Sequence, residues 1–386
     1  MDVLITPAKL SGSLVAPTSK SYAQRFLIAS ALADRPTTLH INGLSDDIKA
    51  TVKALEAMGA RFLLNQEEIT VFPIKTKDNP QIFCGESATA ARLILPVAAA
   101  LFDQATLKGQ GSLLNRPFGP LCQALSSGGV VFESTKLPIT FRGRLQAGEY
   151  KIDGSLSSQY LSGLMLALPL LEGSSSISIT SPLSSAGYVQ MTEHTLRVFR
   201  VEGGYFTPGN QNYLSPREIT VEGDWSNSAF WLAGGVEVQG LNPSSLQRDR
   251  LFVELRQMAS IDGGDVPDLV PILAVCAALR EGETEIYNIA RLSQKESNRL
   301  QSVSTMINSL GGEAVGWEDR LIVKGRGGLI GGQVESSNDH RIVMASAIAS
   351  CFCRKPVLIR GVQAVNKSYP QFFTHFNRLG GKADVF

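Results

Sequence analysis

The stretch LEAMGARF at residues 55–62 sets the pattern from which the fold can be predicted. It reads as the end of a helix, a glycine, and a short apolar strand. Four further stretches follow the same plan: LSSGGVVF at 125–132, FRVEGGYF at 199–206, INSLGGEAV at 307–315 and FNRLGGKADV at 376–385. Glycine suits the left-handed backbone position just past a helix C-terminus, so each stretch predicts a helix that ends at its glycine and leads into a strand.

The spacing of these stretches indicates an internal repeat. A weaker sixth copy, LRQMASI, begins at Leu255, and six units in 386 residues average about 64 residues each. Repeats of this length are supersecondary units that bury their apolar faces together. The first glycines of the five clear copies are Gly59, Gly128, Gly203, Gly311 and Gly380.

Alanine-rich segments recur at the same rhythm, and each runs from helical spacing into a β-type run. They are LIASALADRPTTLHI, LPVAAALFDQATLKG, LMLALPLLEGSSSISI, AFWLAGGVEVQG, LAVCAALREGETEIYN and ASAIASCFCRKPVLIR. Each unit is therefore predicted to read helix, strand, loop, helix, strand. The alternative is an ordinary α/β chain whose elements look alike by chance, which five copies in register argue against.

The bulk composition limits the class of protein. A chain of 386 residues with 44% hydrophobic content exceeds the usual size of a single core, so two domains are expected. Thirty-six Lys and Arg against 35 Asp and Glu give a formal charge of +1, which argues against a general nucleic-acid binder.

Location and redox state follow from the same composition. The five cysteines are scattered and odd in number, which favours a reducing compartment and buried structural thiols rather than disulfides or a metal site. The start MDVLITPAKL lacks the pattern of a signal peptide, and the longest apolar runs, such as 93–102, are too short to span a bilayer. We therefore expect a cytoplasmic protein with no membrane partner.

Polar segments precede the first helix of every unit. They are SKSYAQR, GESATAAR, DGSLSSQY, EGDWSNSA, DVPDLVP and SNDHRIV, all rich in residues that cap helix N-termini. For any one segment, capping alone explains the composition. Six at matching positions, with cations nearby, predict helix ends that converge on an anionic ligand. These cations are Lys20, Arg25, Arg92, Arg116, Lys295, Arg299, Arg341 and Lys367.

The ordered motifs of the chain resemble those of the enolpyruvyl transferase family, and within it the EPSP synthases. The resemblance spans nearly the whole chain. No P-loop, dinucleotide-binding or zinc-protease motif competes with it, so neither a nucleotide cofactor nor a metal is expected. The motifs are PTSKSYAQR, GLSDD, GESATAAR, NRPFGPL, DGSLSSQY, SSAGY, EGD, VPDLVP, KESNRL, NDHR and NKSYP.

The resemblance implies an α/β fold known as an inside-out α/β barrel. It has two domains, each built from three β-α-β-α-β-β repeats with the helices inside. One domain would combine residues 1–18 with 223–386, the other would span 19–222, and the active site would occupy the cleft between them. Family members are mostly monomers, so a monomer is expected by analogy.

The resemblance also implies the reaction: transfer of the enolpyruvyl group of phosphoenolpyruvate to the 5-hydroxyl of shikimate-3-phosphate, in the pathway to aromatic amino acids. The residues that it assigns to shikimate-3-phosphate are Lys20, Ser21, Arg25, Ser157, Ser158, Gln159, Ser185, Tyr188, Asp268 and Lys295. Those that it assigns to phosphoenolpyruvate are Lys20, Ala88, Arg92, Arg116, Gln159, Arg299, Arg341 and Lys367. Each substrate carries a carboxylate and a phosphate of roughly −1.5 to −2, which explains the need for so many cations.

Three residues are expected to move protons. Asp268 is the candidate acceptor of the hydroxyl proton, and Glu296 and Lys20 are candidates for transfer at the methylene carbon. Lys367 and the arginines would stabilise charge on the leaving phosphate. The sequence leaves open which group moves which proton.

Several positions depart from the commonest family pattern. Glu86-Ser87-Ala88-Thr89 stands where Asn-Ala-Gly-Thr is usual, and a methyl group at Ala88 can exclude a larger analogue while admitting the substrate. We therefore predict weak inhibition by glyphosate. Arg291 stands where an Asn often contacts the shikimate ring, and Asn298 replaces an Asp.

Two other functions fit parts of the pattern. A transferase acting on UDP-N-acetylglucosamine shares the fold but carries Lys-Asn where this chain has Lys20-Ser21, and it places a cysteine on a mobile loop. Cys122 instead falls in a helical apolar pattern. A non-catalytic sensor of a phosphorylated metabolite is the second alternative, and the joint presence of Lys20, Asp268, Glu296 and Lys367 speaks against it.

Overall fold

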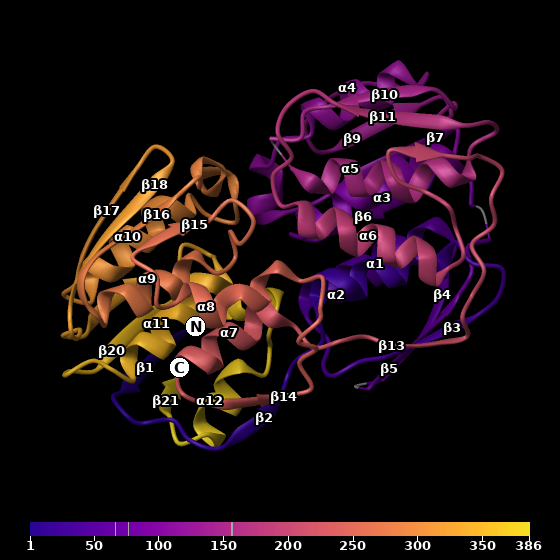
Figure 1. The fold of residues 1–386 in the computed structure, drawn as a ribbon. Coiled ribbons are helices and arrows are strands. Elements are labelled where there is room, and N and C mark those ends of the chain that lie inside the picture. Colours follow the sequence, from indigo (N-terminus) through magenta and orange to yellow (C-terminus); the bar gives the residue numbers. More distant parts are fainter. Residues whose placement is uncertain (66, 76, 156) are drawn as a thin grey trace. The chain divides into compact units, whose positions relative to one another are not determined.

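The computed structural model describes residues 1–65, 67–75, 77–155 and 157–386. These residues form two compact units (Figure 1). One, here called the terminal unit, combines Met1–Pro17 with Gly223–Phe386, and the other, the central unit, is Thr18–Glu222. Both crossings between the units therefore lie immediately before a polar helix start: SKSYAQR in one case and GDWSNSA in the other.

The central unit contains three sheets. In each, the first two strands of the order are parallel and the remaining pairings are antiparallel. The orders are β13 (Glu218–Thr220), β3 (Thr37–His40), β5 (Glu68–Phe72), β4 (Arg61–Leu64); then β6 (Gln81–Phe83), β7 (Gln104–Lys108), β9 (Ile139–Arg142), β8 (Val131–Phe132); and β10 (Glu149–Ile152), β11 (Ser175–Ile179), β12 (Phe206–Thr207).

The terminal unit repeats this plan. Its three sheets again begin with a parallel pair, and the two larger ones continue antiparallel. The orders are β19 (Gly332–Glu335), β20 (Val357–Arg360), β1 (Asp2–Thr6), β21 (Lys382–Val385); then β15 (Ser260–Asp262), β16 (Glu281–Tyr287), β18 (Arg320–Arg326), β17 (Glu313–Trp317); and the pair β14 (Glu237–Gln239), β2 (Ser13–Val15).

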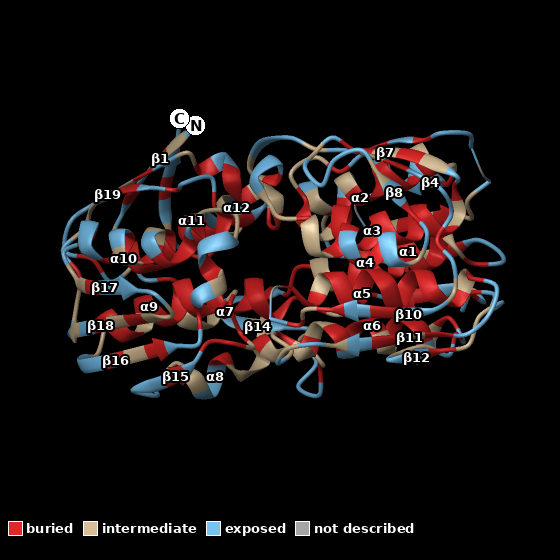
Figure 2. Ribbon diagram, turned by 90° about the horizontal axis from the view of Figure 1, so that it is seen from above, coloured by how far each residue is buried: buried red, intermediate tan, exposed pale blue. Residues whose placement is uncertain are grey.

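Within each unit, the helices divide into buried and half-exposed sets, as the red and blue ribbons of Figure 2 show. Helices that are apolar on all sides belong in an interior, whereas amphipathic ones cover it. The buried set is α1 (Lys20–Ala31), α3 (Ala88–Leu101), α5 (Ser158–Ala167), α7 (Trp225–Ala233), α9 (Val270–Ala278) and α11 (His340–Ser350). The others are α2 (Asp46–Met58), α4 (Gly119–Ser127), α6 (Ala186–Val198), α8 (Phe252–Leu255), α10 (Arg299–Ser309) and α12 (Phe372–Arg378).

Four short 3₁₀ turns of the described ranges precede half-exposed helices: η1 (Gly111–Asn115), η3 (Arg248–Leu251), η4 (Ala290–Gln294) and η5 (Val362–Lys367). A further one, η2 (Leu168–Leu170), directly follows α5. No helix of the described ranges is long and apolar enough to cross a membrane.

The element order confirms the predicted α/β repeat. A full unit reads strand, helix, strand, helix, strand, strand, as in β6–α3–β7–α4–β8–β9 and β15–α9–β16–α10–β17–β18. The first strands of two repeats are exchanged: β2 precedes α1 in the chain but pairs with β14, and β13 precedes α7 but pairs with β3. This exchange accompanies the two crossings between the units.

The weak sixth copy at Leu255 is shorter than predicted. Its helix, α8, has only four residues, and the strand after it, β15, pairs with β16 as the first strand of the next repeat. The repeat that starts at α7 therefore contributes to a sheet of only two strands. The chain between β14 and β15 is too short to hold a full helix and two more strands.

The predicted glycine caps are confirmed at three positions and corrected at two. Gly59, Gly311 and Gly380 have φ of +110°, +81° and +98°. In the second copy the left-handed residue is Gly129 rather than Gly128, and in the third it is Arg200, at φ +55°, rather than Gly203. In that copy α6 ends earlier than the glycine implies, because its last helical residue is Val198.

Candidate active site

Four of the six polar helix starts cap their helices through a side chain. Ser87, Ser157, Asp224 and Asp339 accept hydrogen bonds from backbone N–H groups of α3, α5, α7 and α11. Ser19 before α1 makes no such bond, and neither does Leu269 before α9. The capping prediction is therefore confirmed for four starts and wrong for two.

In the central unit, Arg25 gathers residues that the sequence assigned to shikimate-3-phosphate. Its guanidinium donates to the carbonyls of Ser21 at 2.8 Å and Tyr188 at 3.0 Å, and to Thr192 Oγ1 at 2.8 Å. Arg25 is 1% exposed, and this burial lowers its pKa to about 10. Its hydrogen bonds fix α6 against α1, so Arg25 acts on the packing of the predicted site.

Lys20, the first residue of α1, has an acidic partner that the sequence prediction missed. Its Nζ lies 2.9 Å from Asp47 Oδ2, and both side chains are about 12–13% exposed. Asp47 belongs to the GLSDD motif at the start of α2. The motif was recognised, but nothing in the local sequence pairs its second aspartate with a lysine 27 positions earlier.

Arg92 joins three other predicted segments of the same unit. It donates to Gln159 Oε1 and to the Pro117 carbonyl, both at 3.0 Å, and its guanidinium carbon lies 5.0 Å from the centre of the Tyr160 ring. Gln159 Nε2 in turn donates to Thr89 Oγ1 at 2.8 Å. The starts of α3 and α5 and the loop carrying Arg116 are thereby held together.

The remaining predicted residues of the central unit lie at helix starts. Ala88 is the first residue of α3 and is 8% exposed, and Ser158 is the first of α5. Ser185 precedes α6 with φ +56°, in the left-handed region that non-glycine residues rarely occupy. Each of these residues therefore lies at a helix start, and the convergence of the helix ends on an anionic ligand stays a prediction.

In the terminal unit, Arg299 is the centre of an ion-pair network. Its three nitrogens lie 2.8 Å from Asp268 Oδ1, 2.5 Å from Glu296 Oε2 and 2.9 Å from Asp339 Oδ2. The side chain is fully buried. Burial alone would lower the pKa of Arg299, but the three carboxylates outweigh it and raise that pKa above its ordinary value. Asp339 lies in the NDHR motif, but the sequence prediction did not include it among the site residues.

Arg341 presents two hydrogen-bond donors that no group in the described ranges uses. Its Nη2 lies 3.2 Å from Asp268 Oδ2, whereas Nε and Nη1 are buried without a hydrogen-bond partner there. The residue is 2% exposed. Buried arginine donors are costly to leave unsatisfied, so this pair of N–H groups indicates a binding position for an anion.

Two lysines are the remaining predicted site residues of the terminal unit. Lys295 Nζ lies 3.9 Å from Asp268 Oδ1, and burial, with the nearby Arg299 charge, lowers the pKa of Lys295 to about 8. Lys367 Nζ donates to the Asn338 carbonyl at 2.8 Å, next to the start of α11. The structure thus brings Asp268, Lys295, Glu296, Arg299 and Arg341 together and places Lys367 by the same helix start as Asp339.

Two departures from the family pattern have structural roles. Arg291 donates to the carbonyl of Gly264, and Asn298 caps α10 by accepting from Gln301 N at 3.3 Å. Asparagine and aspartate are both favourable N-cap residues, so the asparagine suits this position.

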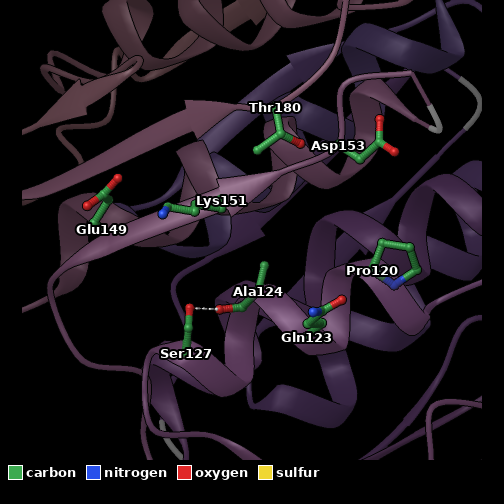
Figure 3. Close-up of a pocket in the computed structure, with 8 residues that line it drawn as sticks. All are labelled: Pro120, Gln123, Ala124, Ser127, Glu149, Lys151, Asp153 and Thr180. Carbon is green, nitrogen blue, oxygen red and sulfur yellow. Dashed lines mark hydrogen bonds between the residues drawn. The ribbon is translucent and has the colours of Figure 1, made fainter.

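A separate depression on the central unit holds none of the predicted residues. It encloses about 600 Å³ and, as Figure 3 shows, has Gln123 and Ser127 of α4 on one side and Glu149 and Lys151 of β10 on the other. Its charged lining residues are Glu149, Lys151 and Asp153, so it lacks the arginines of the groups described above.

Comparison with known proteins points to a single family. The family model for EPSP synthase (3-phosphoshikimate 1-carboxyvinyltransferase) matches residues 4–263 and 247–376. A relative from Clostridium acetobutylicum named 3-phosphoshikimate 1-carboxyvinyltransferase is 38% identical and covers 98% of this chain and 97% of its own length. One of the same name from Clostridium kluyveri is 37% identical, covering 99% and 98%.

Solved structures show the same fold. An EPSP synthase from Acinetobacter baumannii superposes with a TM-score of 0.82 over 100% of both chains, at 23% sequence identity. The fold, the matched family model and the full-length relatives lead to one assignment: the chain belongs to the EPSP synthase family.

Proposed function

We propose that this protein transfers the enolpyruvyl group of phosphoenolpyruvate to the 5-hydroxyl of shikimate-3-phosphate, releasing phosphate. Family membership supports the reaction, and one structural observation supports the chemistry most directly. Asp268 is held by both Arg299 and Arg341, while Arg341 keeps two buried donors for a ligand. In the proposed reaction a carboxylate can accept the proton of the attacking hydroxyl. An arginine with free donors can bind the anionic substrate and stabilise charge that develops on it.

Asp268 is the proposed general base. The arginines at 2.8 and 3.2 Å hold both of its oxygens in place. It accepts the proton of the 5-hydroxyl as that oxygen attacks C2 of phosphoenolpyruvate, and C3 gains a proton. The tetrahedral intermediate then loses phosphate from C2 and a proton from C3, which restores the C2=C3 double bond and gives the enol ether product.

Glu296 and Lys20 are proposed for proton transfer at the methylene carbon. Each has an opposite charge close by: Glu296 faces Arg299 at 2.5 Å, and Lys20 faces Asp47 at 2.9 Å. A group that alternately gives and takes a proton benefits from a nearby counter-charge that stabilises one of its states. We propose that residues of both units act on the same two substrates.

The anionic groups of the substrates are assigned to the cations. The residues proposed to bind phosphoenolpyruvate are Arg341, Arg299, Arg92, Arg116, Gln159, Ala88, Lys20 and Lys367. For shikimate-3-phosphate we propose Lys20, Ser21, Arg25, Ser157, Ser158, Gln159, Ser185, Tyr188, Asp268 and Lys295. Because Arg25 and Arg92 donate to protein carbonyls, part of their proposed role is to hold neighbouring residues in position.

Phosphate release distinguishes the proposed reaction from its rivals. The protein is incubated with phosphoenolpyruvate alone, with shikimate-3-phosphate added, and with UDP-N-acetylglucosamine added. Release only with shikimate-3-phosphate supports the proposal. Release with the sugar nucleotide assigns the sister reaction, and tight binding of shikimate-3-phosphate without release assigns a sensor.

We also propose a cytoplasmic monomer. All five cysteines are free thiols, and burial raises the pKa of each, as at Cys84, where it reaches about 12. A protein without disulfides suits a reducing compartment. Size-exclusion chromatography with light scattering tests the monomer, for which a mass near 41.5 kDa is expected.

A further inference from the structure

The first turn of α7 is a junction between three other segments of the terminal unit. Ser226 donates to the carboxylate of Asp249 on η3, and Asn227 Oδ1 accepts from Ser368 Oγ at 3.3 Å, next to Lys367. One turn further on, the Phe230 ring lies 5.9 Å from the guanidinium carbon of Arg341. Whatever fixes this turn therefore helps to fix two of the cations proposed to bind phosphoenolpyruvate.

Asp249 is an unusual residue to find at such a junction. It is 4% exposed, and it has acidic neighbours in Asp268 before α9 and Asp224 before α7. The charge of Arg341 on α11, which forms an ion pair with Asp268, also acts on Asp249. Its own turn adds Arg248 and Arg250, whose charges flank it in the chain. A buried carboxylate in this setting repels two other carboxylates and competes with one of them for an arginine.

We propose that Asp249 is a positioning residue for the enolpyruvyl transfer and that it performs this role as an uncharged acid. Uncharged, it holds Ser226 and the start of α7 without drawing Arg341 away from Asp268 and the substrate. Ionised, it adds a negative charge that opposes the binding of the anionic phosphoenolpyruvate by Arg341. The inference rests on the proposed function, and it assigns Asp249 no contact with substrate.

Burial and the charges of the two aspartates support this role. They raise the pKa of Asp249 to about 7, although the hydrogen bond from Ser226 and the charge of Arg341 oppose the rise. The uncharged form therefore predominates below about pH 7 and is lost above it. If only that form is competent, kcat/KM for phosphoenolpyruvate falls about tenfold per pH unit above 7.

The test compares Asp249→Asn with the unchanged protein from pH 6 to 9, at saturating shikimate-3-phosphate. Asparagine keeps the shape and cannot ionise. The ratio of kcat/KM, variant over wild type, is expected to stay near one at pH 6 and to rise at least about tenfold by pH 8.5. Ionisation of phosphoenolpyruvate itself cancels in this ratio. Asp384→Asn, on the exposed strand β21, is the matched control and should leave the ratio flat.

A second measurement needs no activity. An acid whose pKa is higher in the folded than in the unfolded chain lowers stability as pH rises between the two values, here from about 4 to about 7. The melting temperature of wild type relative to Asp249→Asn should therefore fall across this window, and the Asp384→Asn difference should not.

The outcomes separate the two hypotheses. If wild type releases no phosphate with both substrates at any pH, the proposed function fails, whatever the melting curves show. If wild type is active but the two pH profiles run parallel, Asp249 is a structural residue only and the inference is overturned. A loss of activity in Asp249→Asn that is equal at every pH would also show that Asp249 is a structural residue only, and it would overturn the inference.

Discussion

Asp268 and Arg299 form a 2.8 Å ion pair in which the arginine is fully buried and the aspartate side chain is 20% exposed. The aspartate is therefore accessible to a substrate while its charge is paired with that of the buried arginine. Asp268→Asn should bind both substrates but lose turnover by about 10²–10⁴-fold, because the amide cannot accept the hydroxyl proton. Steady-state kinetics and calorimetric binding measure the two effects. Asp319→Asn, in an exposed pair with Arg320, is the control, and near-normal turnover of Asp268→Asn would remove Asp268 from the base role.

Arg299 should also be a main determinant of folding stability. It neutralises three carboxylates, of which Asp339 is fully buried, so its removal leaves buried negative charge without compensation. Arg299→Met is expected to lower the free energy of unfolding by about 3–5 kcal/mol, and Arg299→Lys, with fewer donors, by a smaller amount. Urea unfolding measures both. The Arg320 side chain is 42% exposed and pairs with Glu285. Arg320→Met should therefore lower the free energy of unfolding by no more than about 1 kcal/mol. Equal losses for the two arginines would contradict the prediction.

The repeats were predictable because they depend on local chemistry. Glycine at helix ends and caps such as Ser87 and Asp339 act within a few residues of where they stand, so their pattern survives in one sequence. The exchange of β2 and β13 between repeats could not be predicted from local sequence, because each of these strands pairs with a strand more than 170 residues away. The motif prediction placed the site residues at helix starts but did not reveal the acidic partners Asp47 and Asp339, because each lies far along the chain from the cation with which it pairs.

The third copy shows the limit of local signals. Gly203 looks like the other capping glycines, yet Arg200 takes the left-handed position because α6 ends at Val198. A left-handed arginine costs conformational energy that packing must offset, and the sequence pattern carries no information on that packing.

Lys295 predicts a pH dependence for shikimate-3-phosphate. Its pKa of about 8, lowered first by burial and further by Arg299, means that the ammonium is present below pH 8 and is lost above it. The value of kcat/KM for shikimate-3-phosphate should therefore decline through pH 8 at saturating phosphoenolpyruvate. Lys295→Arg keeps its charge to above pH 12, so the ratio of variant to wild type should rise over the same range. A ratio that is constant with pH would show that the charge of Lys295 does not assist binding.

Ala88 predicts weak inhibition by glyphosate. The residue opens α3, is 8% exposed, and stands where a glycine is usual in the family. Ala88→Gly should lower the inhibition constant for glyphosate at least about tenfold, because removing the methyl group relieves crowding that costs roughly 1.4 kcal/mol of binding free energy. The KM for phosphoenolpyruvate should change less. Ala90→Gly, two residues on in the same helix, controls for a weakened helix. Inhibition of the unchanged protein at concentrations close to KM for phosphoenolpyruvate would refute the prediction.

Glu86 should control the loop that carries Arg116. Its Oε2 lies 3.2 Å from Ser112 Oγ and 3.4 Å from Ser112 N, so it joins the start of α3 to η1, four residues before Arg116. Glu86→Ala removes both contacts and should raise KM for phosphoenolpyruvate about fivefold to tenfold, with kcat less affected, because two hydrogen bonds of about 1 kcal/mol each are lost. Glu86→Gln keeps an oxygen that can accept from Ser112 and removes a negative charge near an anionic substrate. It should bind phosphoenolpyruvate at least as well as the unchanged protein. An increase in KM for Glu86→Gln that matches Glu86→Ala would mean that the carboxylate charge, rather than the join to Ser112, is what the loop requires.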